Sequence, residues 1–540
     1  AQILVVNHHL LFADLVMRSE NEEKDVGILP SYNRIIIDEA HNIEDVATEY
    51  FASKISQIEI IRLLARLTSE KGGKIYGKLP LIKERLLNSY RSEMPKEASS
   101  LYSRLNVDLP AMRRDVLQLM HEMFSSFFEF TNLMKNKQNT ASEEEFNGEN
   151  KLRILAPHLS HQFWKERIVP STKILIESFK KYIQSLSALE TDLKQLNNPK
   201  LDEQIKGMVF EVNALSLRLQ NCCSILNTFA SDLLPQSKVR WIELQTFKMM
   251  VNTSLINADL DIAKILAEML FKKMTTVILC SATLTTDRQF QFIRNRLGLT
   301  AELLKKRIIN EFIYESPFNF PQQALLAIPN DLPNPTDPSF IQAASEQIWH
   351  YLQASRGNAF ILFTSYSMLK SCFSILETRL KEGRFHPLKQ GDSDRIFLLN
   401  KFKTTDRSVL FGTDSFWEGV DVAGEALRCV IIVKLPFKVP SEPIIQARSE
   451  AIQALGGDPF TEYSLPQAIV KFKQGFGRLI RNRNDRGCIV CLDNRLTTKR
   501  YGRLFLNSLP ACEQFFASGK EIQQRMTEFY RKTHFLTKAN

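Results

Sequence analysis

The chain has 540 residues, of which 44% are hydrophobic and 24% are charged, and its formal net charge is +10. This length allows roughly two to four domains, and no apolar run reaches the roughly 18 residues that a membrane-spanning helix needs. Eight cysteines suggest no disulfide framework, which fits a reducing compartment. The composition therefore argues against a disulfide-bonded secreted protein and a helical membrane protein, and it predicts a cytoplasmic one.

The positive charge is concentrated near the end of the sequence. Residues 471–540 hold 15 Lys and Arg against 5 Asp and Glu, so the preceding 470 residues are balanced at 55 against 55. A basic segment in an otherwise neutral protein favours contact with phosphates. The alternative is a solvated basic tail.

The first 60 residues alternate between strand and helix. Residues 3–6 and 35–37 are predicted strands, residues 10–17 form a predicted helix, and a second helix is expected after Asn42. The chain opens without Met and without a signal peptide, on what reads as a strand inside a domain. We therefore expect a fragment that lacks its natural N-terminus.

Residues 60–234 show helical periodicity instead. Apolar stripes at three-to-four spacing run through residues 116–127 and 215–229, and a polar stretch from Lys135 to Lys151 predicts a loop. Such stripes indicate core packing, so the region is predicted to be a helical insertion.

Strands return at residue 276. A Pro-rich stretch at 329–338 is predicted to connect two domains, and strand–helix alternation follows it. Predicted strands cover residues 359–363, 409–411, 429–433 and 488–492, with predicted helices at 368–379 and 466–479. The fold class is therefore α/β, with two parallel-sheet domains and a helical insertion in the first.

The strand at Ile35–Ile37 runs directly into Asp38-Glu39-Ala40-His41. A nucleoside triphosphatase needs one carboxylate for Mg²⁺ and a second to orient water, both at the carboxyl end of a strand. The alternative is a helix N-terminus, where acidic residues favour the dipole. The remaining motifs decide between the two.

Four further segments follow the acidic box in order. They are Ser281-Ala282-Thr283-Leu284, Ile361–Tyr366 with Thr364 and Ser365, Phe411–Asp421 with Thr413, Trp417, Gly419 and Asp421, and Gln474–Arg481 with Arg478. Arg478 and Arg481 are three residues apart and are predicted to share one side of a helix. An arginine from a second domain stabilises the charge of a phosphoryl-transfer transition state, so five motifs in this order favour a nucleoside triphosphatase over a chance match.

This set resembles the superfamily 2 helicases, and most closely the XPD/DinG family of DNA helicases. The segments Val6–Leu11, Glu315–Asn319 and Lys434–Phe437 also look like landmarks of that family. The resemblance implies two RecA-like domains, at residues 1–60 with 238–300 and at 301–540, with an arch-like insertion at 61–237.

The resemblance also implies roles in the nucleotide site. Asp38 would hold Mg²⁺ through water, Glu39 would polarise the hydrolytic water, and His41 would link the site to the neighbouring motifs. Gln474, Arg478 and Arg481 would approach the γ-phosphate of ATP, with Arg478 or Arg481 as the arginine finger. Gly419 and Asp421 would contribute to the nucleotide side of the cleft.

Coupling and DNA contacts follow in the same way. Coupling is assigned to Ser281, Ala282 and Thr283, and contact with single-stranded DNA to Thr364, Ser365, Thr413 and Trp417. For Trp417, base stacking and bracing of its loop are both open.

Two family features have no counterpart in the sequence. No G-x-x-x-x-G-K-[ST] loop precedes Asp38, and the segment Gly72–Leu79 matches that spacing only up to Leu79, which cannot ligate Mg²⁺. No cysteine occurs before Cys222, so the ligands of any iron–sulfur cluster would lie upstream of Ala1. Cys488 and Cys491 have CxxC spacing, but two buried thiols explain them better than a metal site.

The sequence therefore predicts part of an ATP-dependent DNA helicase that moves along single-stranded DNA, with a 5′→3′ polarity implied by the resemblance alone, and that unwinds duplexes in repair or replication. The chain by itself is expected to hydrolyse ATP poorly and to bind no iron. Two alternatives stay open, a non-catalytic nucleic-acid-binding relic and an RNA-directed helicase.

Overall fold

The structure is a computed structural model that describes residues 3–20, 27–90, 93–138, 149–247, 250–305, 307–417, 422 and 424–536. The chain forms two compact units. Unit 1 comprises residues 1–47, 261–441 and 448–540, and unit 2 comprises residues 48–260 and 442–447. No helix in the described part of the chain is long and apolar enough to cross a membrane.

Unit 1 contains a seven-stranded sheet in which every neighbouring pair is parallel. The strand order is β11-β12-β10-β13-β14-β9-β15. The strands are β9 (Ala324–Pro329), β10 (Ala359–Leu362), β11 (His386–Lys389), β12 (Ser408–Gly412), β13 (Cys429–Ile432), β14 (Gly487–Cys491) and β15 (Glu513–Ala517). This sheet confirms the predicted α/β class.

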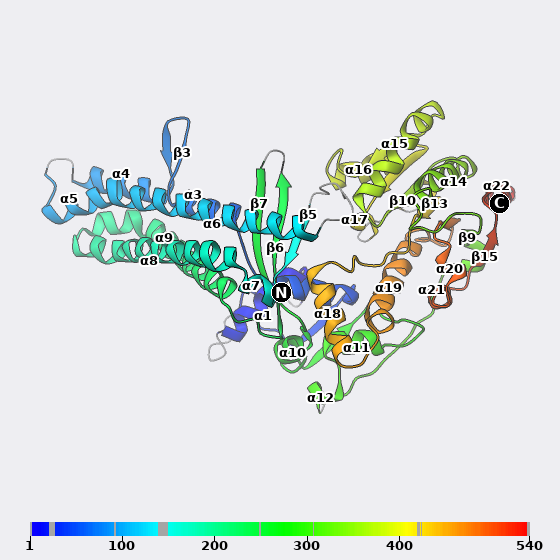
Figure 1. The fold of residues 1–540 in the computed structure, drawn as a ribbon, viewed down its shortest axis with the longest axis horizontal. Helices are drawn as coiled ribbons and strands as arrows, with labels where there is room; N and C mark the ends of the chain where they lie inside the picture. The colour runs from blue at the N-terminus through cyan, green and yellow to red at the C-terminus, as the bar shows by residue number, and fades with distance from the viewer. Residues whose placement is uncertain are drawn as a thin grey trace. The chain divides into compact units, whose positions relative to one another are not determined.

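Helices cover both faces of this sheet, as the apolar runs of its central strands require. On one face Ala359 and Ile361 pack beneath α14, α15 and α22, and on the other Phe360 and Leu362 pack beneath α16, α17, α19, α20 and α21 (Figure 1). The helices are α14 (Phe340–Ser355), α15 (Tyr366–Glu382), α16 (Arg395–Thr404), α17 (Asp414–Trp417), α19 (Leu465–Phe476), α20 (Arg495–Thr498), α21 (Gly502–Asn507) and α22 (Gly519–Leu536).

The alternation of side chains between the two faces of the sheet also tests whether the CxxC segment could bind a metal ion. Cys488 and Cys491 both lie on β14, three positions apart, so their side chains point to opposite faces of the sheet. Both are fully buried. Two thiols on opposite faces cannot bind one metal ion, and the interpretation as two core thiols is confirmed.

The other parallel pair of unit 1 joins β1 (Arg34–Ile37) to β8 (Thr276–Leu279), with Ile37 opposite Leu279. The outer side chains of this pair are open to solvent, since Ile36 is 71% and Ile278 49% exposed. The remaining helices of unit 1 include α1 (His8–Glu20), α10 (Ala263–Leu266), α11 (Gln291–Leu297), α12 (Ala301–Leu304) and α13 (Phe320–Gln323). Helices α2 (Ile43–Phe51) and α18 (Pro443–Ala454) each pass from one unit into the other.

Unit 2 is a bundle of long helices joined to an antiparallel sheet of order β2-β7-β6-β5. In Figure 1 its helices run alongside one another. The helices are α3 (Gln57–Leu67), α4 (Lys78–Ser89), α5 (Lys96–Ser103), α6 (Leu109–Gln138), α7 (Ala156–Ser160), α8 (Val169–Gln195) and α9 (Pro199–Ala230). The strands are β2 (Ser53–Ser56), β5 (Glu149–Arg153), β6 (Lys238–Phe247) and β7 (Met250–Asp259), and one apolar core joins helices and sheet.

The structure corrects several predictions made from the sequence. Residues 3–7 form no regular secondary structure. The Pro-rich stretch does not join two domains, because it connects β9 to α14 within the seven-stranded sheet domain. Residues 48–60 and 238–260 lie in unit 2, where the sequence assigned them to the first α/β domain. Most of the predicted polar loop, residues 139–148, lies outside the described residues.

Candidate functional site

The acidic box lies at the carboxyl end of β1, beside the end of β8. The backbone N–H of Cys280 donates to the carbonyl of Ile37 (2.9 Å), and the N–H of Ala40 donates to the carbonyl of Cys280 (3.1 Å). Because the two strands are parallel, Asp38 and Ser281 leave the sheet at the same edge. Glu39 also precedes a short 3-10 helix, Ala40–Asn42, as its N-cap residue, but its side chain makes no capping hydrogen bond, so the strand-end interpretation is favoured.

The Asp38 carboxylate is exposed and only partly engaged. Its Oδ1 accepts from the Glu39 N–H (3.0 Å) and lies 3.6 Å from the thiol of Cys280, while Oδ2 makes no hydrogen bond among the described residues. A carboxylate oxygen that faces solvent at a strand end suits a hard cation such as Mg²⁺. Burial, together with the negative charge of Asp38, raises the pKa of the Cys280 thiol, which keeps it neutral beside the carboxylate.

Glu39 has a left-handed backbone, with φ 49° and ψ 44°. A non-glycine residue in this region carries strain of about 1–3 kcal/mol, and such strain concentrates at functional sites. The conformation leaves its side chain 61% exposed, with Oε2 accepting a hydrogen bond from the Ser281 hydroxyl (3.1 Å). Glu39 is thus held at the mouth of the site and not in the core.

His41 connects three segments that are far apart in the sequence. Its Nδ1 lies 2.7 Å from Ser281 Oγ and 3.1 Å from Thr283 Oγ1, and its Nε2 lies 2.5 Å from Gln474 Nε2. With this amide orientation Gln474 donates, so His41 Nε2 accepts and Nδ1 carries the proton. Thr283 is buried, whereas Ala282 lies exposed in the turn between the two hydroxyl residues.

Gln474 carries a buried amide oxygen, Oε1, that has no hydrogen-bond partner within the described part of the chain. A buried acceptor without a donor costs about 1–3 kcal/mol. An unpaired acceptor beside the acidic box therefore suggests a functional role for Gln474. A second contact supports this arrangement, because Lys473 Nζ donates to the carbonyl of Thr285 (3.1 Å). Burial lowers the pKa of Lys473.

The prediction that Arg478 and Arg481 share one side of a helix is wrong. Helix α19 ends at Phe476, and both arginines lie in the turn that follows. Arg478 is 8% exposed, and its Nε donates to the carbonyl of Trp417 (2.7 Å). Arg481 is exposed, and Asp485 fixes its backbone by accepting from its N–H (2.8 Å). Arg478 is therefore buried and Arg481 exposed.

The predicted DNA-contact residues lie at the carboxyl ends of β10 and β12, which are neighbours in the sheet. The hydroxyl of Thr364 makes no hydrogen bond among the described residues, while that of Ser365 caps α15 by accepting from the Met368 N–H (3.3 Å). The hydroxyl of Thr413 donates to Gln390 Oε1 (3.0 Å). All three residues are partly accessible.

Trp417 is fully buried. Its Nε1 donates to the carbonyl of Phe363 (3.2 Å), and Gly475 gives it room, since a Cβ there would lie 2.9 Å from Trp417 Cζ3. This environment favours bracing of the loop over stacking on a base. Gly419 and Asp421 lie outside the described residues.

The segment Gly72–Leu79 is not a loop between a strand and a helix of the core. It forms the end of a β-hairpin in unit 2, made of β3 (Ser69–Lys71) and β4 (Lys74–Tyr76), with Gly72 and Gly73 at positive φ in its turn. This bears out its rejection as a phosphate-binding loop. Within the described residues no group of three or more His, Cys, Asp and Glu could hold a metal ion.

Sequence reasoning missed a buried ionic cluster directly after the acidic box. Glu44, in the first turn of α2, accepts from Arg296 Nη2 (2.7 Å) and lies 2.6 Å from Arg448 Nη1. Arg448 Nη1 also donates to the hydroxyl of Tyr463 (2.9 Å), and the Arg296 guanidinium lies 4.9 Å from the ring centroid of the same tyrosine. Glu44 stands three residues after His41, and that spacing alone gave no signal of its partners.

The chain is similar to a known protein family and to several known proteins. The family described as "Helicase C-terminal domain" matches residues 348–512. The chain is 30% identical over 537 residues to "3'-5' exonuclease DinG" of Bacillus subtilis, with 97% of this chain and 53% of that protein covered. It is also 30% identical over 526 residues to "ATP-dependent DNA helicase YoaA" of Haemophilus influenzae, with 97% of this chain and 69% of that protein covered.

An XPD helicase structure shares 13% identity, covers 92% of this chain and is itself 71% covered, with a TM-score of 0.46, too low to bear on the argument. The acidic box, the Ser-Ala-Thr turn and the Gln-x-x-Gly-Arg-x-x-Arg segment thus occur in a chain that is 30% identical to a protein named as an ATP-dependent DNA helicase. The chain belongs to the XPD/DinG family of helicases. It spans about half the length of the Bacillus subtilis relative and about two thirds of the Haemophilus influenzae one.

Proposed function

We propose that the intact protein is an ATP-dependent DNA helicase, which couples ATP hydrolysis to movement along single-stranded DNA and to duplex unwinding. The observation that carries the proposal is the contact of His41 with Ser281, Thr283 and Gln474. It joins the acidic box to the turn that bears the two arginines. A protein that only bound nucleic acid would have no need of this connection.

In this proposal Asp38 holds the Mg²⁺ of Mg-ATP, because its Oδ2 is open and exposed. Bound Mg²⁺ would neutralise charge on the phosphates. Glu39 orients the attacking water from a fixed, exposed position. Arg478 or Arg481 would serve as the arginine finger: Arg478 is buried, with its Nε donating to the carbonyl of Trp417, and Arg481 is exposed.

Gln474 contacts the acidic box through His41 and so couples the nucleotide site to the turn that follows α19. Its unpaired Oε1 is available to a donor on bound water, while Nε2 stays with the imidazole. Movement of the turn at residues 477–481 would therefore change the contact between Gln474 and His41 in the acidic box. Thr364, Ser365 and Thr413 are the proposed DNA contacts, because hydroxyl groups at a strand end suit the sugar-phosphate backbone.

The test uses the protein expressed from its complete coding region. Single-stranded-DNA-stimulated ATP hydrolysis is compared between wild type, Glu39→Gln and Arg481→Ala, with Glu302→Gln as the matched control because Glu302 is an exposed carboxylate of the same unit. We expect both site variants to lose roughly 100-fold or more of the rate while binding single-stranded DNA as tightly as wild type. The control should keep the wild-type rate.

Two outcomes would overturn the proposal. Binding of DNA without any hydrolysis by the wild type would leave a nucleic-acid-binding relic. Unwinding of RNA duplexes but not of DNA duplexes would make RNA the substrate. A strand-displacement assay on duplexes with a 5′ or a 3′ single-stranded tail tests the 5′→3′ polarity in the same experiment.

A further inference from the structure

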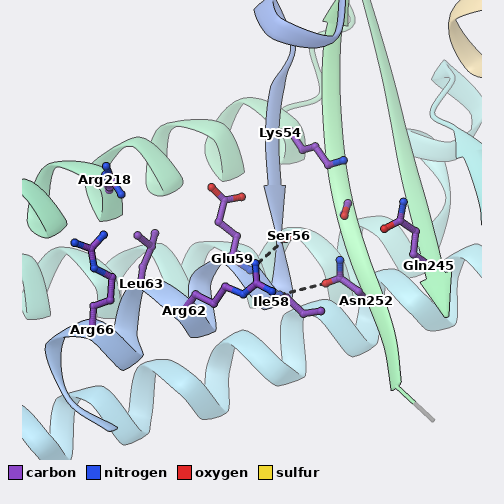
Figure 2. A pocket seen from close by; sticks show the side chains of 11 residues that line it. Lys54, Ser56, Ile58, Glu59, Arg62, Leu63, Arg66, Arg218, Gln245 and Asn252 are labelled. Carbon is purple, nitrogen blue, oxygen red and sulfur yellow. Dashed lines mark hydrogen bonds between the residues drawn. The ribbon is translucent and has the colours of Figure 1, made fainter. Parts of the chain in front are cut away.

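A cavity of about 530 Å³ lies in unit 2, where α3 meets the antiparallel sheet and α9 (Figure 2). Residues from β2, α3, α9, β6 and β7 contribute to it. It is lined by Lys54, Ser56, Ile58, Glu59, Arg62, Leu63, Arg66, Arg218, Gln245, Asn252 and Ser254. We call it the basic pocket. No residue of the proposed motor site takes part in it.

The charge of the basic pocket is strongly one-sided. Its ionisable side chains are Lys54, Arg62, Arg66 and Arg218 against Glu59. Arg66 lies 3.8 Å from Glu211, a carboxylate that already pairs with Lys78 at 2.6 Å. The other three cations make no ion pair with any residue that the structure describes. Like charges kept together without counterions indicate an anionic ligand.

The polar groups around the cations fit an anion with several oxygens. Asn252 and Ser254 are buried lining residues, and the amide oxygen of Asn252 accepts from the Ile58 N–H (3.2 Å). Only Ile58 and Leu63 are apolar among the lining residues. The other nine lining residues are polar or charged, and they offer many hydrogen-bond donors to a phosphate.

The spacing of the arginines points to a chain of phosphates. Arg62 and Arg66 are four residues apart on α3, so they stand on one side of that helix about 6 Å apart along its axis. Arg218 extends from α9, a helix that packs against α3. The cations therefore line the two sides of an open groove, and all of them are exposed.

We propose that the basic pocket binds the sugar-phosphate backbone of a single-stranded nucleic acid. A strand laid along α3 would place successive phosphates beside Arg62 and Arg66, with Arg218 across from them. This adds a second nucleic-acid contact, in the helical unit, to those proposed at Thr364 and Thr413. It does not depend on ATP hydrolysis.

Glu59 is the one group that opposes such a ligand. It lies in the first turn of α3 and forms no hydrogen bond through its carboxylate among the described residues, although its backbone N–H donates to Ser56 Oγ (3.2 Å). Its removal should therefore strengthen binding, while removal of the arginines weakens it. Opposite effects from two changes in one pocket are not expected from damage to the fold.

The test measures the affinity of the full chain for a fluorescent oligothymidine at several KCl concentrations, without ATP. For Arg62→Gln/Arg218→Gln, the loss of two phosphate contacts should reduce the log–log salt slope by about 1.4 and the affinity near 0.1 M salt by roughly 25-fold. The matched control is Arg85→Gln/Arg114→Gln, which removes two exposed arginines of the same unit outside the pocket. Its slope should equal that of wild type, and Glu59→Gln should bind at least about twofold tighter.

Four results would overturn the proposal. The pocket variant could match the control variant, or Glu59→Gln could leave the affinity unchanged. Inorganic phosphate at low millimolar concentration could displace the oligonucleotide from wild type but not from the pocket variant, which would make this a free-phosphate site. Loss of polyglutamate binding with intact oligothymidine binding would make the partner an acidic polypeptide. Circular dichroism of each variant excludes misfolding as the cause.

Discussion

The buried carboxylate of Glu44 gives the sharpest stability prediction. Its side chain is 6% exposed, and it accepts from Arg296 Nε (3.0 Å) and Nη2 (2.7 Å) and lies 2.6 Å from Arg448 Nη1. The Arg448 side chain is only 2% exposed. Glu44→Gln would keep the shape of the side chain but remove the charge that both guanidinium groups face. Burial alone would lower the pKa of Arg296, and Glu44 outweighs it, so the net effect is a raised pKa.

Breaking one partner of a buried ion pair costs about 3–5 kcal/mol, because the remaining charge stays buried without compensation. We expect this cost for Glu44→Gln and for Arg448→Gln. The two effects should not add: the double variant should be about 2 kcal/mol less destabilised than their sum. An exposed pair sets the scale, since Lys180 and Glu177 are each 62% exposed and Glu177→Gln should cost less than about 1 kcal/mol.

Hydrogen–deuterium exchange of peptides from α2 and α11 is the suitable assay, because unfolding of a chain with two units need not be two-state. A loss of 3–5 kcal/mol corresponds to a roughly 150- to 5,000-fold faster exchange of the protected amides. Acceleration by less than about tenfold, or strict additivity in the double variant, would refute the reasoning. Peptides from α8 should exchange at the wild-type rate in every Glu44 variant.

Three further predictions concern other buried groups. Asp14 is fully buried and accepts from Arg18 Nε (2.7 Å); burial raises its pKa, but its hydrogen bonds outweigh burial and the net pKa is lowered. The stabilisation of the fold by the charged Asp14 carboxylate is therefore complete above the unfolded-state pKa of about 4, and it is lost as pH falls through the lower folded-state pKa. Asp14→Asn should therefore lower the thermal midpoint at pH 7, and the difference from wild type should disappear in acid. Gly475→Ala should cost about 1–3 kcal/mol, seen by urea unfolding, because its Cβ would lie 2.9 Å from the buried Trp417 ring. Burial raises the pKa of Cys488 to about 12, so iodoacetamide at pH 8 should alkylate it only after denaturation.

One result would contradict each of these three predictions. An Asp14→Asn effect that is independent of pH would show that the carboxylate is not charged in the native state. Unchanged stability of Gly475→Ala would mean that the Trp417 ring has room to move. Native alkylation of Cys488 at the rate of the unfolded chain would contradict its burial.

Four strands of the second α/β domain, β10, β12, β13 and β14, could be predicted from the sequence because each one is a short apolar run bounded by polar residues. The predicted strand at 359–363 is β10, and that at 429–433 is β13. Strands β9, β11 and β15 were not predicted. β11 contains His and Pro, and β15 carries charged and polar residues among its phenylalanines, so neither shows the apolar pattern of a buried strand.

What the sequence by itself determined is local: a strand that ends at Asp38, a Ser-Ala-Thr turn after another strand, and an order of motifs that defines a helicase family. What only the tertiary structure decided depends on contacts between distant segments. The unequal burial of Arg478 and Arg481 follows from the end of α19 and from the carbonyl of Trp417, and the partners of Glu44 are brought from more than 250 and 400 residues away. A charged residue looks the same in sequence whether it faces water or a buried partner, because packing, and not local propensity, sets its environment.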